Sequence, residues 1–130
     1  MTEAGLAGKT YPAVSFEIDQ QRAAEFARAI GADPAGGVPP TFAAVYSLGA
    51  TAPQLFDDPD AAIDFAKLLH AEQEFVWTRH PKPGEKVISR GRIASDVSRR
   101  GMRFVWFETE TKGTNGEDVC KSRALFVIRQ

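Results

Sequence analysis

The residues with the clearest capacity for chemistry are His70 and Glu72, which stand two positions apart in "LLHAEQEFVW". Polar and apolar side chains alternate along this segment, which predicts a β-strand, and residues two apart on a strand point to the same face. A carboxylate that orients an imidazole makes a general base, so the pair has the parts of an acid–base site. The alternative is the polar face of a half-buried strand, which has the same alternation.

A carboxylate before proline, Asp33-Pro34, marks the loop "GADPAGGVPPTF" (31–42). Asp-Pro commonly starts a turn, which is the simpler interpretation, and a vestigial catalytic acid is the alternative. Proton transfer needs a base within hydrogen-bond reach of the reacting water, and this loop contains no histidine. The loop therefore predicts a connector in front of a helix and lacks a complete catalytic pair.

Three arginines, Arg99, Arg100 and Arg103, cluster at a predicted hairpin turn. The guanidinium fork matches phosphate oxygens, so these three arginines are candidates for holding the phosphates of a ligand. A solvated turn is the alternative, because charge clusters are common in turns.

The cysteine and histidine residues indicate neither a nucleophilic cysteine nor a metal site. The single cysteine, Cys120, alternates with apolar residues, so we interpret it as a core residue and not as a nucleophile. No Cys/His grouping has the spacing of a metal site, and there is no glycine-rich phosphate loop. We expect no metal and no cofactor.

The bulk composition is that of one ordinary globular domain over residues 1–130. The chain is 43% hydrophobic and 25% charged, with a net charge of −1, so nothing indicates binding to nucleic acid or to a membrane surface. No apolar run approaches the roughly 20 residues of a membrane span. One cysteine excludes a disulfide framework, and "MTEAGLAGKTYP" lacks the features of a signal peptide, so we expect a cytoplasmic protein.

The elements that must position these residues fall into a helical first half and a strand-rich second half. After a short strand in "YPAVSFEI", Asp19 is a predicted N-cap and Gly31 a predicted C-terminal stop. Thr41 is the predicted cap of a helix, "FAAVYSLGAT", that is apolar nearly all round and hence buried. Asp58-Pro59 predicts a short third helix.

The second half is read as four long antiparallel strands. The Asn-Gly in "TNGE" is a hairpin signal, and Cys120, Ser122, Ala124, Phe126 and Ile128 share one face of the last strand. Such a sheet, with the short first strand, needs one apolar helix to cover its inner face. The predicted fold is α+β: a single hot-dog domain, in which an antiparallel sheet wraps around a central hydrophobic helix.

The order of "GKTY", "PPTF", "LLHAEQEF.W.R.PKPGE" and "TNGED…SRALFVIR" resembles the N-terminal domain of the MaoC-like dehydratases, also called FAS1-like dehydratases. This group includes non-catalytic subunits of hydroxyacyl dehydratases. The resemblance covers nearly the whole chain. It implies a hot-dog fold and an acyl thioester ligand, carried by coenzyme A or by acyl carrier protein. It also implies hydration or dehydration at the second and third acyl carbons.

Two departures from the catalytic members stand out. Those members carry an Asp, then Asn-Pro, then a His before the central helix, whereas here Asp33-Pro34 has no His after it. They also use a free backbone N–H at the helix start to polarise the thioester carbonyl. Pro39 and Pro40 have no N–H, which leaves those of Thr41 and Phe42.

The resemblance and the departures together predict a non-catalytic, tunnel-forming subunit of a heteromeric enoyl-CoA hydratase, or 3-hydroxyacyl-thioester dehydratase. A catalytic hot-dog partner would supply the Asp–His pair, in a heterodimer or a dimer of heterodimers. No residue of this chain is predicted to be catalytic. The candidates for substrate binding are Thr41, Phe42, Ala44, Ser47, His70, Glu72, Arg99 and Arg100. Alternatives are a stand-alone acyl-CoA-binding protein or a hot-dog thioesterase, although "TFAAVYSLGAT" offers no acid for the latter.

Overall fold

Four long segments with alternating side chains form the framework of the fold. The computed structural model describes residues 2, 3 and 5–130. The long strands are β3 (Leu68–Trp77), β4 (Lys86–Arg99), β5 (Met102–Gly113) and β6 (Asp118–Arg129). Two short strands, β1 (Thr2–Glu3) and β2 (Val14–Glu17), both pair with β4. All pairings are antiparallel, and the order β1-β4-β5-β6-β3 places β3 at an edge.

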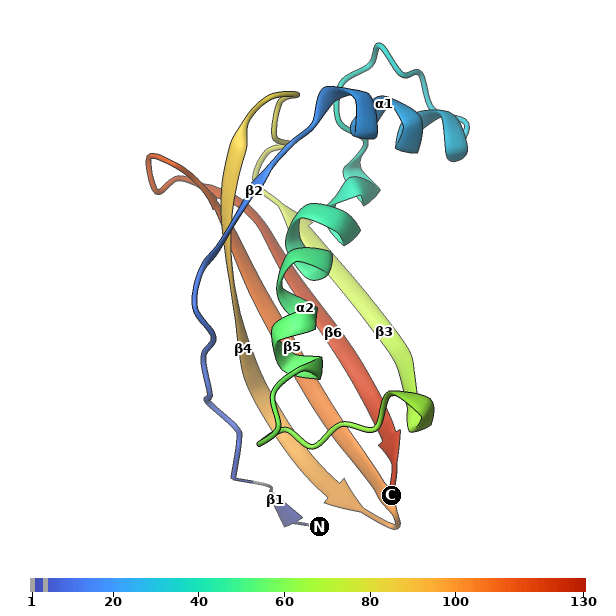
Figure 1. The fold of residues 1–130 in the computed structure, drawn as a ribbon, viewed down its shortest axis with the longest axis vertical. Coiled ribbons are helices and arrows are strands. Elements are labelled where there is room, and N and C mark those ends of the chain that lie inside the picture. The colour runs from blue at the N-terminus through green and yellow to red at the C-terminus, as the bar shows by residue number, and fades with distance from the viewer. Residues whose placement is uncertain (1, 4) are drawn as a thin grey trace.

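One helical run in three parts lies inside the curved sheet. A 3-10 turn, η1 (Pro40–Phe42), leads into a π-helical segment, η2 (Ala44–Leu48), and then into α2 (Gly49–Phe56). Figure 1 shows this central run crossing the inner face of the sheet, with α1 (Gln20–Ala29) at its start. Leu55 packs there with the buried side chains of Ile93 and Phe107. The prediction of a hot-dog fold is confirmed.

The local signals around α1 are confirmed. The Asp19 carboxylate accepts a hydrogen bond from the backbone N–H of Arg22 at 3.3 Å, as an N-cap does. Gly31 has a φ of +78°, a backbone conformation that favours glycine. The ring of Phe26 meets the ring of Phe42 edge-on, with centroids 5.2 Å apart. Helix α1 therefore packs on the start of the central run. No helix in the described part of the chain is long and apolar enough to cross a membrane.

The predicted helix at Asp58-Pro59 is wrong. Residues 57–61 form turns, and the next helical segment is the 3-10 turn η3 (Phe65–Lys67), capped by Asp64. The Asp58 carboxylate accepts hydrogen bonds from Lys9 Nζ at 2.6 Å and from Tyr11 Oη at 2.7 Å. Its other oxygen accepts from the backbone N–H of Asp60 at 2.9 Å. Asp58 thus ties the segment before β2 to the loop after α2, a contact that local sequence signals do not contain.

Acid should weaken the fold through Asp58. The hydrogen bond from Lys9, and then that from Tyr11, lowers the pKa of Asp58 to about 2. An aspartate in an unfolded chain titrates near 3.9, so the contribution of Asp58 is complete above about pH 4 and is lost as the pH falls to about 2. Asp58→Asn should therefore flatten the pH dependence of the unfolding free energy in that window, measured by denaturant titration. The exposed neighbour provides a control: equal flattening by Asp57→Asn would contradict this role.

Gly49 permits the π-helical turn. Its N–H bonds the carbonyl of Ala44, five residues back, and a Cβ on Gly49 would lie 2.8 Å from that carbonyl oxygen. Because the obstacle is backbone, a side chain here would force the turn to shift. Segments of π-helix often occur at functional sites, and this one follows directly on the 31–42 loop.

We expect Gly49→Ala to lower the free energy of unfolding by about 1–2 kcal/mol, because the clash outweighs the better helix propensity of alanine. Thermal or denaturant unfolding of the purified variant measures the effect. Gly5→Ala is the control, since a Cβ at Gly5 would meet no atom within 4 Å. A Gly49→Ala protein at least as stable as the parent would show that the turn relaxes without cost.

Candidate functional site

The loop before the central run is closed by its own hydrogen bonds. The Asp33 side chain accepts a hydrogen bond from the backbone N–H of Ala35 at 2.9 Å. The backbone carbonyl of Asp33 accepts one from the N–H of Gly36, also at 2.9 Å. This is an Asx turn, so the turn interpretation of Asp33 is confirmed. Residues 31–37 are exposed, and Val38 and Pro39 are buried where the loop meets the core. One carboxylate oxygen is committed to the turn, and no histidine stands beside it in the loop.

The helix start differs from the prediction in two respects. Its N-cap is Pro39, with Pro40 as the first helical residue, so Thr41 lies inside η1 and does not cap it. Proline suits this first position because its φ is already helical. The N–H of Phe42 donates to the carbonyl of Pro39 at 3.0 Å, and the Phe42 side chain is buried. The amide of Phe42 is therefore used inside the turn and is not available to polarise a thioester.

Ala44 and Ser47 lie on different sides of η2. Ala44 is exposed, whereas Ser47 is fully buried and its Oγ makes no hydrogen bond to any described residue. Thr51 Oγ donates to the carbonyl of Ser47 at 2.9 Å and lies 2.8 Å from Thr109 Oγ. Of the two, only Ala44 borders the exterior of the central run.

Buried hydroxyls attach the central run to the sheet. Ser89 Oγ donates to the carbonyl of Tyr46 at 3.1 Å and lies 2.7 Å from Thr111 Oγ. The carbonyls of a π-helical segment lack the regular α-helical partner, so a hydroxyl from the sheet can satisfy one of them. These hydroxyl residues were not among the predicted site residues. The signal was the row of Thr and Ser at alternate positions on the inner faces of β4, β5 and β6.

A β-bulge separates the predicted His70–Glu72 pair. The register of β3 with β6 shifts at Ala71, so that His70 pairs with Phe126 and Glu72 with Leu125. Adjacent residues of β6 point to opposite faces, and so do their partners. His70 lies on the inner face, 5.0 Å from the Phe126 ring between centroids, and Glu72 lies on the outer face. The prediction of a shared face is wrong, because one extra residue interrupts the two-residue period.

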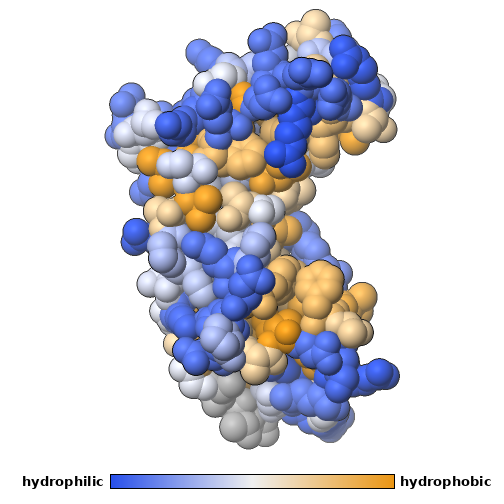
Figure 2. Space-filling model, viewed as in Figure 1, coloured by the Kyte–Doolittle hydropathy of each residue, from blue (hydrophilic) through white to orange (hydrophobic). Residues whose placement is uncertain are grey.

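The inner side of β3 is only partly covered. We call this side, formed by His70, Gln73, Phe75 and Trp77, the β3 groove. Its residues face the same way as the core, yet His70 and Gln73 are exposed and Phe75 and Trp77 are half-buried. The central run packs mainly on β4, β5 and β6 and leaves this edge open. Figure 2 shows the molecule hollowed at mid-height on that side, with apolar residues along the hollow.

At the helix start, the groove meets a buried aromatic and sulfur cluster. Burial raises the pKa of Tyr46, with the neighbouring Cys120 as the second cause, so the phenol keeps its proton. Burial also raises the pKa of Cys120 to about 11. A thiol with such a pKa is hardly ionised at neutral pH, and the thiolate is the reactive form. Cys120 is therefore placed as a core residue, as the sequence predicted.

The arginine cluster lies at the other end of the sheet. Arg99 ends β4 and Arg100 begins the β4–β5 turn, with the guanidinium of Arg99 5.6 Å from the Phe104 ring centroid. Ser89 of β4 contacts the helix start, and Arg99 is ten residues further, about 33 Å at the rise of a strand. Arg103 binds Asp96 and does not join the other two. The structure does not bring Arg99 and Arg100 together with Thr41, Ala44 or Ser47.

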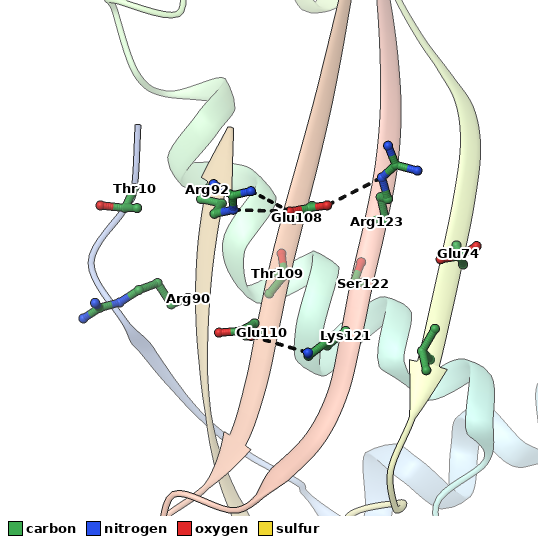
Figure 3. Close-up of a pocket in the computed structure, with 11 residues that line it drawn as sticks. Thr10, Glu74, Arg90, Arg92, Glu108, Thr109, Glu110, Lys121, Ser122 and Arg123 are labelled. Carbon is green, nitrogen blue, oxygen red and sulfur yellow. Dashed lines mark hydrogen bonds and ion pairs between the residues drawn. The ribbon is translucent and has the colours of Figure 1, made fainter. Parts of the chain in front are cut away.

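The outer face of the sheet carries a depression of about 570 Å³. Figure 3 shows its charged side chains on β4, β5 and β6, with the helix behind the sheet. Glu108 pairs with Arg92 at 3.1 Å and with Arg123 at 3.5 Å, and Glu110 pairs with Lys121 at 3.9 Å. The sheet separates this depression from the 31–42 loop, and its carboxylates at Glu108 and Glu110 are ion-paired. We therefore place the candidate site in the β3 groove. Among the described residues, no three His, Cys, Asp or Glu side chains gather closely enough to hold a metal.

Relatives of known sequence match most of the chain. The family model of the FAS1-like, dehydratase domain region matches residues 6–122. A UPF0336 protein of Thermobifida fusca is 31% identical over 129 residues, covering 88% of this chain and 84% of its own. One from Leifsonia xyli is 31% identical over 116 residues, covering 89% of this chain and 72% of its own.

Solved structures share the fold at low sequence identity. The HadBC (3R-hydroxyacyl-ACP dehydratase) complex of Mycobacterium tuberculosis contains a chain with a TM-score of 0.75 and 22% identity, covering 97% of this chain and 99% of that chain. The ChsH1-ChsH2 complex of the same organism contains a chain with a TM-score of 0.72 and 18% identity, covering 93% of this chain and 89% of that chain. A MaoC-like dehydratase has a TM-score of 0.81 and 17% identity, covering 97% of this chain and 43% of its own length. This chain belongs to the FAS1-like dehydratase family and has the hot-dog fold of the MaoC-like dehydratases.

Proposed function

We propose that this chain, as one hot-dog unit of residues 1–130, is the non-catalytic subunit of a heteromeric enoyl-thioester hydratase. It would act in the cytoplasm on the thioester of coenzyme A or of acyl carrier protein. The chain would shape the acyl tunnel, and a catalytic hot-dog partner would supply the Asp–His pair. The observation that supports this proposal most strongly is in the 31–42 loop. There the Asp33 carboxylate accepts a hydrogen bond from the N–H of Ala35, and no histidine follows it.

Neither histidine of the chain replaces the missing base in this loop. His80 lies after β3 and outside the loop, with its ring 5.7 Å from the Trp77 ring between centroids. His70 does not share a strand face with Glu72, so no carboxylate two residues away orients its ring. The central run, residues 40–56, contains no aspartate or glutamate, so it offers no carboxylate for a thioesterase mechanism. The 31–42 loop and the central run therefore lack a group to activate water over a thioester at the helix start.

The edge strand β3 supports pairing with a second hot-dog chain. It is at the edge of the sheet, and its side chains Leu69 and Val76 are 64% and 56% exposed. An unpaired edge with exposed apolar residues favours the addition of another strand. The similar HadBC and ChsH1-ChsH2 structures are complexes.

Co-expression tests the proposal. The gene of a neighbouring hot-dog protein with an intact Asp…His loop is expressed with this chain, and each chain and the complex are assayed for hydration of an enoyl-CoA. We expect turnover by the complex and none by this chain alone. Turnover by the pure chain, above that of a mock preparation, would overturn the proposal, and so would the absence of any complex.

The exposed position of Ala44 gives a test of the tunnel itself. Ala44→Phe should weaken the binding of long acyl-CoA by about tenfold or more, because a bulky group at this exposed position of η2 would take the space of an acyl chain that runs past the start of the central run. Isothermal titration with long-chain and short-chain acyl-CoA measures the effect, which should be confined to long chains. Ala13→Phe, also at an exposed alanine, is the control. Unchanged long-chain affinity in a folded Ala44→Phe protein would place the tunnel elsewhere.

A further inference from the structure

The polar end of the β3 groove has a construction that an apolar acyl tunnel does not need. His70 Nε2 lies 3.0 Å from Gln73 Oε1, and Gln73 Nε2 donates to Ser122 Oγ at 2.9 Å. These three side chains all lie on the inner face, on two neighbouring strands. The Ala71 bulge is what turns His70 inward, since the regular period would point it outward with Glu72. Bulges that redirect one side chain are frequent next to functional sites.

The hydrogen bonds fix which nitrogen of His70 carries the proton. Gln73 Nε2 also donates to the backbone carbonyl of Glu74 at 3.2 Å. A carbonyl only accepts, so the amide nitrogen must be on that side and the amide oxygen must face His70. The oxygen in turn requires a proton on His70 Nε2. In the neutral ring, Nδ1 is then the acceptor, and it makes no hydrogen bond to any residue in the described part of the chain.

His70 lies at the opposite end of the groove from the helix start, where the thioester is proposed to bind. The helix start packs beside Cys120, which pairs with Trp77 of β3. His70 pairs with Phe126, whose ring lies 5.2 Å from that of Phe56 at the end of α2. Six residues of β6 separate the two levels, about 20 Å at the rise of a strand. Between them the groove is apolar at Phe75 and becomes polar at Gln73.

From this geometry we infer that the chain recognises an acyl group with a hydroxyl far from the thioester, which donates a hydrogen bond to His70 Nδ1. His70 is then a specificity-determining residue, and Gln73 and Ser122 are positioning residues that act through it. The inference rests on the proposed function for the direction in which the acyl chain lies. The tautomer of His70 follows from the structure alone.

A matched pair of ligands tests the inference. Palmitoyl-CoA and ω-hydroxypalmitoyl-CoA, which differ only in the terminal hydroxyl, are titrated at pH 8.5 into the complex with the catalytic subunit. We expect the hydroxylated ligand to bind about tenfold more tightly, the difference typical of one net hydrogen bond. His70→Phe should remove this preference and keep the affinity for palmitoyl-CoA. His80→Phe, the same change at the other histidine, should keep the preference.

A spectroscopic measurement keeps the inference testable if His70→Phe fails to fold. Long-range ¹H–¹⁵N correlation spectra should show His70 in the Nε2–H tautomer, and Gln73→Leu should produce a mixture of tautomers and reduce the preference for the hydroxylated ligand. An Nδ1–H tautomer, equal affinities in the parent protein, or a preference that survives His70→Phe would overturn the inference. If no complex forms, the proposed function fails, and the same titration on the single chain still decides the inference. If neither acyl-CoA binds to the complex or to the single chain, both the proposed function and the inference fail.

Discussion

Replacing Asp96 by asparagine is expected to lower the free energy of unfolding by about 3–5 kcal/mol. Asp96 is fully buried on β4, and its two oxygens accept from Arg103 Nε and Nη2 of β5 at 2.8 Å each. Arg103 also donates to the carbonyl of Ala61, in the loop after α2. The substitution leaves the guanidinium buried without its counter-charge, and the loss of one partner of a buried pair is far more costly than the net value of the pair.

Two comparisons separate this mechanism from a general packing defect. The double variant Asp96→Leu, Arg103→Met should recover at least half of the loss, because it removes both charges. Glu108→Gln removes the carboxylate that pairs with Arg92 and Arg123, whose side chains are 50% and 47% exposed, and should cost at most about 1 kcal/mol. Denaturant unfolding of the four proteins gives the values. A double variant as unstable as Asp96→Asn would show that the buried charge is not the cause.

In the heteromer proposed above, loss of the catalytic histidine of the partner is expected to lower kcat of the complex by about 10²–10⁴-fold, the usual contribution of general acid–base catalysis. This chain has no base in its own loop, so one pair of hot-dog chains would contain one productive site and not two. His80→Ala in this chain should leave kcat unchanged, because His80 lies in the turn after β3.

The number of productive ligand sites per complex tests independently whether only one chain of each pair is catalytic. Titration of the complex with a non-hydrolysable acyl-CoA analogue should saturate at one productive ligand per two hot-dog chains. Two equivalent sites per pair would refute the assignment of this chain as the non-catalytic member. So would full activity after removal of the partner's histidine, since the base would then have to come from this chain.

The sequence by itself determined the features that depend on neighbours along the chain. The two-residue period predicted the four long strands. Cys120, Ser122, Ala124, Phe126 and Ile128 share the inner face of β6 as predicted, because successive residues of a strand point to opposite faces. Asp19 caps α1 as predicted, since a cap bonds an N–H only three residues away. The missing histidine of the 31–42 loop is likewise visible in the sequence alone.

Only the tertiary structure decided the contacts between distant residues. Asp58 resembles a helix cap, yet it binds Lys9 and Tyr11, nearly fifty positions earlier, and the predicted helix does not form. Arg103 belongs by sequence to an exposed cluster, yet a buried carboxylate draws it away from Arg99 and Arg100.

The candidate site shows the same division most clearly. The residue types "LLHAEQEF" mark β3 as chemically interesting, but the bulge at Ala71 decides that His70 faces inward and Glu72 outward. A bulge is set by the register with the partner strand, and that register is a property of β3 and β6 together. The sequence could therefore name His70, while the fold alone decided that its partner is Gln73, which in turn donates to Ser122.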